Sequence, residues 1–298
     1  HMRGLILMKS KLCIGTVKIG VPSYGHSITN KPDDHNTFFS KAVEMGITCF
    51  DTSPRYANSE SILGDFVKKY NKKLFIATKI DNLNASNKTI FHKMRESALR
   101  SIENLNVEFI DLCYLHQNEL QIISNNNVLD GLNKLKQEGL IKNIGASVYS
   151  VEELDYTIKS KSFDWVQIPV NIMDTSFYNR IIESGSTINI AARSIFLQGV
   201  IFNSAAIKKK IPDADRMMES LNLIKSFGDQ HNLKLIDLAV SYVCSLSSLD
   251  QVLVGTASIK NLEKVKKASK ILLNDNIKSL FDEISRIRKP WTNPRAWI

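Results

Sequence analysis

Short apolar runs alternate with segments of helical periodicity from one end of the chain to the other. Eight runs are rich in Val, Ile, Leu and Phe, which is typical of strands buried on both faces. These predicted strands cover residues 12–16, 47–51, 74–79, 109–116, 141–147, 165–168, 188–192 and 252–254. No apolar run approaches the ~18 residues that a membrane-spanning helix needs, so we expect no membrane partner.

The segments between these runs repeat their apolar residues at the spacing of amphipathic helices. Helices are predicted at residues 34–45, 59–69, 88–105, 128–138, 151–158, 215–231, 235–246 and 259–268. Ser59 is an expected N-cap and Gly139 an expected C-terminal stop. Ser150, followed three residues later by Glu153, has the pattern of a capping box.

Alternation of strand and helix over the whole length predicts a parallel sheet, either closed into a barrel or open and doubly wound. The open nucleotide-binding sheet carries G-x-G-x-x-G after its first strand, and Gly15, Gly20 and Gly25 do not have that spacing. Eight units therefore favour an α/β fold of the closed kind, a single (β/α)8 TIM barrel with extra C-terminal helix and loop segments. We expect one domain over residues 3–298, with His1-Met2 as a cloning remnant.

The formal charge of +9 comes from 39 basic and 30 acidic residues, and the lysines are scattered in short runs. The chain has no basic stripe interleaved with aromatic residues, so we expect no nucleic-acid partner. An anionic cofactor or substrate accounts for the positive charge equally well. The four cysteines include no C-x-x-C pair, and Cys13, Cys49 and Cys113 lie in predicted strands. They are expected to be buried reduced thiols, which favours a cytoplasmic protein, and we expect no metal site.

Four proton-active side chains fall at the carboxyl ends of successive predicted strands. Asp51 ends the second strand and Tyr56 follows it, while Lys79 ends the third and His116 the fourth. Each of them also has a structural interpretation when taken singly. Asp51 could cap a turn, and Tyr56 could be a surface aromatic residue. Lys79 could bury its aliphatic chain and keep its ammonium in water, and His116 could be a hydrogen-bonded histidine of the core. Because a barrel directs all its strand ends to one mouth, we interpret them together as a catalytic tetrad.

The chemistry that suits the tetrad is the reduction of a carbonyl group. A carbonyl that accepts a hydride needs a proton at its oxygen, and Tyr56 could supply it if its pKa fell from ~10 toward neutrality. A lysine charge at ~4 Å is worth roughly 4 kcal/mol in a partly polar surrounding, so Lys79 could lower that pKa. Asp51 would hold Lys79, and His116 would bind the carbonyl oxygen. The hydride must come from a cofactor, because no side chain carries one.

Three blocks of the chain resemble the aldo-keto reductase superfamily. They are Gly46-Ile-Thr-Cys-Phe-Asp-Thr-Ser-Pro-Arg-Tyr-Ala-Asn-Ser-Glu60, Asp111-Leu-Cys-Tyr-Leu-His116 and Gly139-Leu-Ile-Lys-Asn-Ile-Gly-Ala-Ser147. The resemblance implies a (β/α)8 barrel and reversible NADPH-linked reduction of aldehydes and ketones. It also implies that Asp51, Tyr56, Lys79 and His116 are the catalytic residues.

The same resemblance implies where the cofactor binds. It places the cofactor against Gly15, Thr16, Asp51, Ser147, Gln167, Arg193, Ser194, Phe196, Gln198, Gly199, Gly255, Thr256, Ser258, Lys260 and Asn261. Two positions depart from the family: Val148 replaces an Asn that binds the carboxamide, and Arg193 replaces the aromatic ring that stacks on nicotinamide. A guanidinium plane can also stack.

The loop from Gly255 to Leu262 is similar to the family's adenosine-phosphate loop, and a helix that starts there offers an anion site. The family often has Arg at the position of Ala257, against the 2′-phosphate. Lys260 is the expected substitute, so we predict NADP(H) to be favoured over NAD(H).

The segments around Gly15 and Phe196 resemble a bacterial branch found with enzymes of sugar and polysaccharide biosynthesis. The expected substrate is therefore a small-molecule carbonyl derived from a sugar or a nucleotide-sugar. Two alternatives stay open: an aldose 1-dehydrogenase that uses NAD(P)+, and a non-enzymatic cofactor-binding regulatory subunit. Trp291 in the C-terminal segment is expected either to line the pocket or to pack on the side of the barrel.

Overall fold

A computed structural model describes residues 10–25, 33–70, 72–83, 89–116, 119–293 and 297. The cloning remnant expected at His1-Met2 lies outside the described residues. Among the helices that are described, none is long and apolar enough to cross a membrane.

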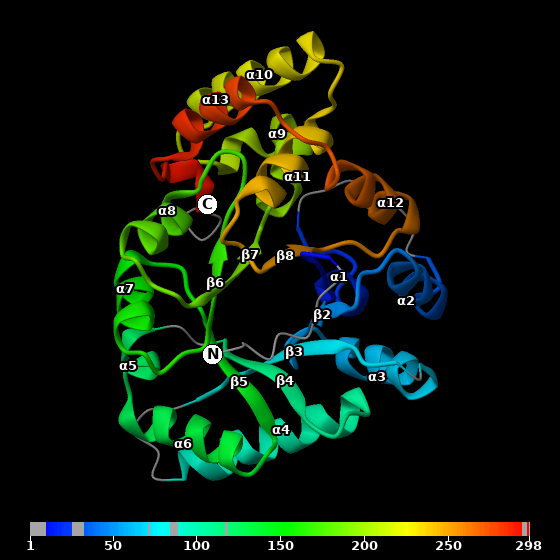
Figure 1. Cartoon of the computed structure of the whole chain (residues 1–298), viewed down its shortest axis with the longest axis vertical. Coiled ribbons are helices and arrows are strands. Elements are labelled where there is room, and N and C mark those ends of the chain that lie inside the picture. Colours follow the sequence, from blue (N-terminus) through cyan, green and yellow to red (C-terminus); the bar gives the residue numbers. More distant parts are fainter. Residues whose placement is uncertain are drawn as a thin grey trace.

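Eight parallel strands close into a barrel in sequence order, with β1 paired to β8 (Figure 1). The strands are β1 (Leu12–Gly15), β2 (Cys49–Asp51), β3 (Phe75–Ile80), β4 (Ile110–Leu115), β5 (Ile141–Ser147), β6 (Trp165–Pro169), β7 (Asn189–Arg193) and β8 (Gln251–Val254). Each overlaps one of the eight predicted strands. The closed barrel is therefore confirmed, and the open sheet is excluded.

Two hydrophobic clusters divide the core, because successive side chains of a strand point to opposite faces. The smaller cluster holds Cys13, Cys49, Phe75, Ala77, Leu112, Tyr114, Trp165, Ala191 and Leu253, which face the barrel interior. The larger cluster holds the alternate strand residues, such as Leu12 and Ile14, packed against the helices. The thiols of Cys13, Cys49 and Cys113 are free and buried, as expected.

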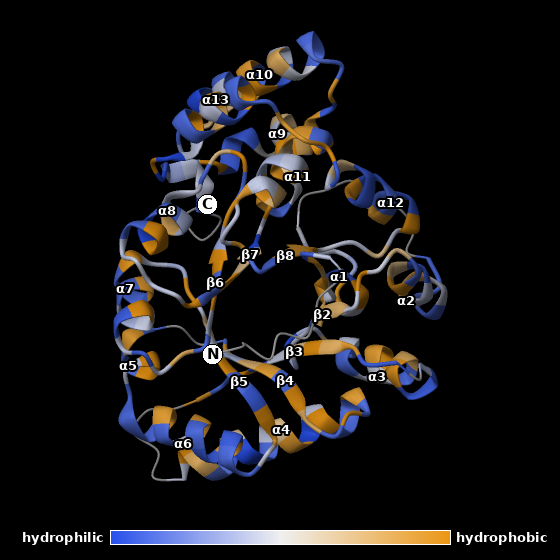
Figure 2. Cartoon of the chain, viewed as in Figure 1, coloured by the Kyte–Doolittle hydropathy of each residue, from blue (hydrophilic) through white to orange (hydrophobic). Residues whose placement is uncertain are grey.

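Helices surround the barrel, and Figure 2 shows polar and hydrophobic residues alternating along them. The predicted helices appear as α2 (His35–Glu44), α3 (Ser59–Lys69), α4 (Ile90–Leu105), α6 (Asn126–Gln137), α7 (Val151–Lys159), α10 (Ala214–Gln230), α11 (Leu235–Ser245) and α12 (Ile259–Ala268). The capping box of Ser150 and Glu153 is present, and Gly139 follows α6 with a φ of +75°. The N-cap assignment of Ser59 is wrong, because Asn58 holds that position and the Ser59 hydroxyl contacts Thr52 instead.

The described residues form five further helices, of which only the last, near the C-terminus, was expected, and without bounds. They are α1 (Val17–Gly20), α5 (Leu120–Ile123), α8 (Ser176–Glu183), α9 (Val200–Ile207) and α13 (Asp275–Ser285), and there are also three 3-10 turns, η1 (Leu197–Gly199), η2 (Lys208–Lys210) and η3 (Pro290–Thr292). Two of the helices have four residues, which is too short for a periodic pattern. The eight helices predicted with bounds are therefore recovered. The helix α8 after β6 and the short helices α1, α5 and α9 were missed, and α13 is the C-terminal helix that was expected without bounds.

The C-terminal segment packs on the loops that follow β5 and β6. Trp291 is 4% exposed within the larger core cluster and is absent from the lining of the central cavity. The hydroxyl of Thr292 donates to Asp174 over 2.7 Å, and the Arg288 guanidinium donates to the carbonyl of Tyr149 over 3.0 Å. Of the two roles expected for Trp291, packing is the one that the structure shows.

Candidate active site at the carboxyl ends of the strands

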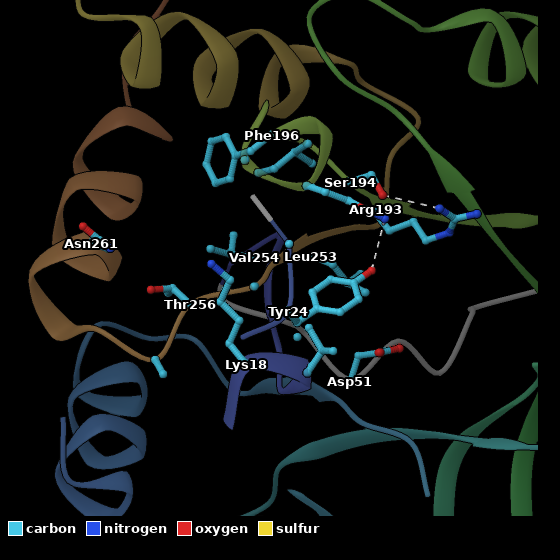
Figure 3. A pocket seen from close by; sticks show the side chains of 18 of the residues that line it. Lys18, Tyr24, Asp51, Arg193, Ser194, Phe196, Leu253, Val254, Thr256 and Asn261 are labelled. Atoms are coloured by element: carbon cyan, nitrogen blue, oxygen red, sulfur yellow. Dashed lines mark hydrogen bonds between the residues drawn. The ribbon is translucent and has the colours of Figure 1, made fainter. Parts of the chain in front are cut away.

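A cavity of about 950 Å³ opens where the barrel strands end. The last residues of five strands line it: Gly15 of β1, Asp51 of β2, Ser147 of β5, Arg193 of β7 and Val254 of β8. Figure 3 shows Asp51 on one side of the cavity and Thr256 with Asn261 on the opposite side. Parallel strands that close into a barrel put these residues, which are far apart in the sequence, around one space.

An ion pair lies at the inner end of this cavity. The ammonium of Lys79, on β3, is 2.5 Å from Oδ1 of Asp51 and also donates to the carbonyl of Thr52 over 2.8 Å. The two side chains are only 2% and 4% exposed. The other oxygen of Asp51 accepts from the Gln167 amide on β6 over 2.9 Å, so the carboxylate joins strands on opposite sides of the barrel.

Burial lowers the pKa of the Lys79 ammonium, but the neighbouring Asp51 carboxylate and Tyr56 raise it, and the net position is above the ordinary value. Lys79 therefore keeps its positive charge at the pH of the cell. Without that partner, a buried lysine would tend to lose its proton.

Tyr56 lies in the turn between β2 and α3, and the ammonium of Lys79 is 5.2 Å from the centre of its ring. The turn packs closely on α1, because a Cβ at Gly20 would lie 1.7 Å from the carbonyl oxygen of Tyr56. Glycine at position 20 thus allows the close approach that places the Tyr56 ring beside Lys79.

The expected fall in the pKa of Tyr56 is not found. Burial raises the pKa of the phenol above its ordinary value, and the opposing charge of Lys79 is the smaller effect. Forming a phenolate away from water costs more free energy than the charge of Lys79 returns.

His116 follows β4 and lines the cavity beside Tyr56. The two rings are 6.2 Å apart between centres and nearly perpendicular. Nδ1 of His116 lies 3.3 Å from the Ser53 hydroxyl and 3.2 Å from the Asp81 carboxylate. The structure therefore brings all four predicted tetrad residues to one cavity, together with two polar neighbours that were not predicted.

Most of the residues predicted to bind the cofactor also line this cavity. They are Gly15, Asp51, Ser147, Gln167, Arg193, Ser194, Phe196, Gln198, Gly199, Gly255, Thr256, Ser258 and Asn261. Two others do not line it. Thr16 is fully buried under the strand end, where its hydroxyl contacts the Asp51 carbonyl and Ser59, and Lys260 lies outside the lining.

The guanidinium of Arg193 is 3.7 Å from the centre of the Tyr149 ring and donates to the carbonyl of Val148 over 2.9 Å. Its plane is therefore packed on an aromatic ring of the protein. Tyr149, which the sequence interpretation overlooked, lines the cavity with it.

Lys264 lines the cavity on the face of α12 that also carries Asn261 and Val265. Lys264 could have been predicted from the sequence, because it is three residues after Asn261, and residues three or four apart share one face of a helix. At the start of the same helix, the Asp33 carboxylate accepts from the backbone N–H of Ile259 over 2.6 Å. One amide of this helix terminus is therefore already occupied by an acidic side chain.

The model of the aldo/keto reductase family matches residues 11–286. D-arabinose 1-dehydrogenase of Saccharomyces cerevisiae is 24% identical over 74% of this chain and 72% of its own length. NADH-specific methylglyoxal reductase of Escherichia coli is 21% identical over 82% of this chain and 85% of its own.

Among solved structures, the glycerol dehydrogenase of Gluconobacter oxydans has the same fold. It superposes with a TM-score of 0.71 over 92% of this chain and 91% of its own, at 22% identity. Aldo-keto reductases use nicotinamide cofactors. Because the family model covers nearly the whole barrel, the chain belongs to the aldo/keto reductase family and is an oxidoreductase of carbonyl compounds.

Proposed function

We propose that this protein reduces an aldehyde or ketone with NAD(P)H and that Tyr56 gives the proton. The observation that carries the proposal is the buried pair of Lys79 and Asp51 beneath Tyr56 and His116 in one cavity. Burying two charges costs desolvation free energy, so a buried ion pair adds little to the stability of the fold. Its position next to a phenol therefore indicates a role in catalysis.

In this mechanism the Tyr56 phenol donates its proton to the carbonyl oxygen as the carbonyl carbon is reduced. The raised pKa keeps the phenol protonated before the reaction. The ammonium of Lys79 then stabilises the phenolate that remains, and Asp51 holds the ammonium in place. His116 contacts the substrate oxygen from the other side of the site. The reverse sequence of proton steps oxidises an alcohol, so the same residues serve a dehydrogenase.

A bound nicotinamide cofactor would supply or accept the hydride. The cavity is large enough for such a ligand, since ligand pockets are about 300–1,000 Å³. We propose that Ser147 and Gln167, which hydrogen-bond to each other over 3.3 Å, hold the carboxamide end. The loop from Arg193 to Gly199 and the start of α12 would hold the phosphates and the adenosine.

We further propose that NADPH binds more tightly than NADH by a modest margin, through Lys264 rather than Lys260. Lys264 lines the cavity and offers a positive charge to a 2′-phosphate, whereas Lys260 does not reach it. The Asp33 carboxylate at the start of α12 opposes a second negative charge there, which keeps the preference small.

The proposed substrate is a sugar-derived carbonyl compound, either a free sugar or one linked to a nucleotide. The similarity to D-arabinose 1-dehydrogenase and the formal charge of +9 support this choice. Lys18 and Arg193 would place positive charge near an anionic substituent. We propose a cytoplasmic location, which suits the free thiols of Cys13, Cys49 and Cys113.

The test is turnover of the purified protein with NADPH and NADH on generic aldehydes, methylglyoxal and open-chain sugars, followed by the oxidation of aldoses. Reduction that depends on Tyr56 supports the proposal. Oxidation of aldoses without measurable reduction would favour the aldose 1-dehydrogenase. Tight cofactor binding with no turnover in either direction would contradict both and favour a regulatory subunit.

A further inference from the structure

The guanidinium of Arg193 is held in a fixed orientation in the wall of the cavity. The Tyr149 ring covers one of its faces, with 3.7 Å between the guanidinium carbon and the ring centre. Its Nη2 donates to the carbonyl of Val148 over 2.9 Å, and its Nη1 donates to the Ser194 hydroxyl over 3.4 Å (Figure 3). Because the residue is half-buried and lines the cavity, the face opposite Tyr149 is the one available to a planar ligand.

Tyr149, on which the guanidinium packs, is itself fixed through its backbone. Its N–H donates to the Glu153 carboxylate over 2.7 Å, and its carbonyl accepts from Arg288 over 3.0 Å. The ring therefore cannot turn away without breaking contacts at both ends of the residue. A ligand that packs on Arg193 finds the side chain already ordered, so binding costs little conformational entropy.

Arg193 also carries a positive charge that has no counter-ion. Among the residues that the structure describes, its guanidinium forms no ion pair, and its buried Nε has no hydrogen-bond partner. Two other cations near the site are compensated, because Lys79 pairs with Asp51 and Arg288 lies 4.0 Å from Asp174. The charge of Arg193 is therefore left to act on whatever occupies the cavity.

The position of Arg193 relates it to one end of the proposed cofactor site. The ends of β5, β6 and β7 adjoin, since the N–H of Val148 donates to the Gln167 carbonyl and the N–H of Val170 to the Arg193 carbonyl, each over 3.0 Å. The inference rests on the proposed function, in which Ser147 and Gln167 hold the carboxamide. The nicotinamide ring is bonded to that carboxamide, so the guanidinium at the next strand end is within its reach. An arginine plane can pack on such a ring.

We propose that Arg193 is a specificity-determining residue that makes the site bind the reduced cofactor more tightly than the oxidised one. The nicotinamide ring carries a positive charge when oxidised and none when reduced. Two positive charges repel at close range, and the repulsion is stronger in a half-buried site than in water. Packing of the planes is common to both forms, so the charge of Arg193 disfavours only the oxidised one.

The same preference changes the bound redox couple. The ratio of the two dissociation constants, oxidised over reduced, sets how far the reduction potential of the bound couple lies above that of the free couple. A tenfold ratio corresponds to about 30 mV for a two-electron couple. The oxidised cofactor would also leave readily after each reduction and inhibit turnover only weakly.

Isothermal titration calorimetry without substrate tests the proposal and needs no turnover. NADPH and NADP+ are titrated into the parent, Arg193→Gln and Arg193→Lys, and then NADH and NAD+. The phosphates are the same within each pair, so their contacts cancel in the ratio of the dissociation constants. Glutamine keeps a planar donor and removes the charge, whereas lysine keeps the charge and removes the plane.

In the parent we expect the oxidised cofactor to bind more weakly than the reduced one. Arg193→Gln should lower the ratio of the dissociation constants by about tenfold, or 1.4 kcal/mol, and Arg193→Lys should keep most of it. Lys264→Ala is the matched control for a second cation that lines the cavity. It should weaken NADPH and NADP+ alike and leave their ratio unchanged.

Two results would overturn the proposal. In one, Arg193→Gln weakens both forms equally and leaves the ratio unchanged, which would make Arg193 a packing surface alone. In the other, the ratio is lost in Arg193→Lys and kept in Arg193→Gln, which would assign the preference to the plane. If Arg193→Gln does not fold, Arg193→Met removes the same charge and is judged by the same ratio. A parent that binds neither form would contradict the proposed function itself, whereas binding of both with an unchanged ratio contradicts this inference alone.

Discussion

Replacing Lys79 with Met separates the structural and chemical roles of the buried ion pair. The variant removes an ammonium that is 2.5 Å from Asp51 and keeps a side chain of similar length. The Asp51 carboxylate would remain 4% exposed, with only the Gln167 amide as a side-chain donor. Two effects should follow, one on stability and one on the pH dependence of the reaction.

The loss of stability can be estimated from the burial of both partners. Breaking a buried ion pair by removing one charge costs about 3–5 kcal/mol, because the other charge is left without its partner. For a barrel of this size the melting temperature should fall by roughly 5–15 °C. The double variant Asp51→Asn/Lys79→Met leaves no stranded charge, so it should recover a large part of that loss.

The chemical effect concerns Tyr56. Lys79 is the charge that lowers the pKa of this phenol against the effect of burial, so Lys79→Met should raise that pKa further. The phenol would stay protonated to higher pH and be a weaker acid. Reduction should therefore slow, and in alcohol oxidation, which needs the phenolate, the alkaline limb of the rate profile should move to higher pH. Rates are measured against pH in both directions and normalised to folded protein. An unmoved oxidative limb in a well-folded variant would show that Lys79 does not tune Tyr56.

The other predictions address the proton donor, the cofactor and the packing of the Tyr56 turn. Tyr56→Phe should lower the reduction rate by about 10²–10⁴ and leave cofactor affinity close to that of the parent, as measured by turnover and fluorescence titration; activity within a few-fold of the parent would refute the assignment. In the unmodified protein the pKa of Tyr56 lies above its ordinary value of about 10, so the rate of alcohol oxidation should still be rising near pH 10, and a plateau well below that pH would contradict this. Lys264→Ala should weaken NADPH binding and leave NADH binding unchanged, whereas Lys260→Ala should change neither; equal affinities for both cofactors in the parent would show that no 2′-phosphate site exists here. Gly20→Ala should destabilise the fold by roughly 1–3 kcal/mol in chemical denaturation, because the added Cβ would overlap the Tyr56 carbonyl, and a stable, fully active variant would show that the turn can move away.

The strands and the position of the tetrad could be predicted from the sequence because both depend on local patterns. Buried strands are continuous apolar runs, and closure of the barrel then brings Asp51, Lys79 and His116 to one mouth whatever the details of the loops.

The parts that could not be predicted depend on how loops pack in three dimensions. Asp81 is only two residues from Lys79, yet its contact with His116 depends on the turn after β3, which no periodicity reveals. The pKa of Tyr56 depends on how completely the surrounding loops exclude water. Arg193 could be placed at the end of its strand from the sequence, but not its contact with Tyr149.

Asp51 accepts hydrogen bonds from Lys79 on β3 and from Gln167 on β6. This proposed catalytic residue therefore also links strands across the interior of the barrel. Sequence change at this position would have to satisfy chemistry and folding at once, and a neutral replacement would strand the Lys79 charge. Tyr24, Tyr149 and Phe202 line the same cavity but lie in loops and a helix, where they do not link strands of the barrel. We therefore expect new substrate preferences to evolve, or to be engineered, through those loop and helix positions. Asp51 and its partners inside the barrel should stay the same.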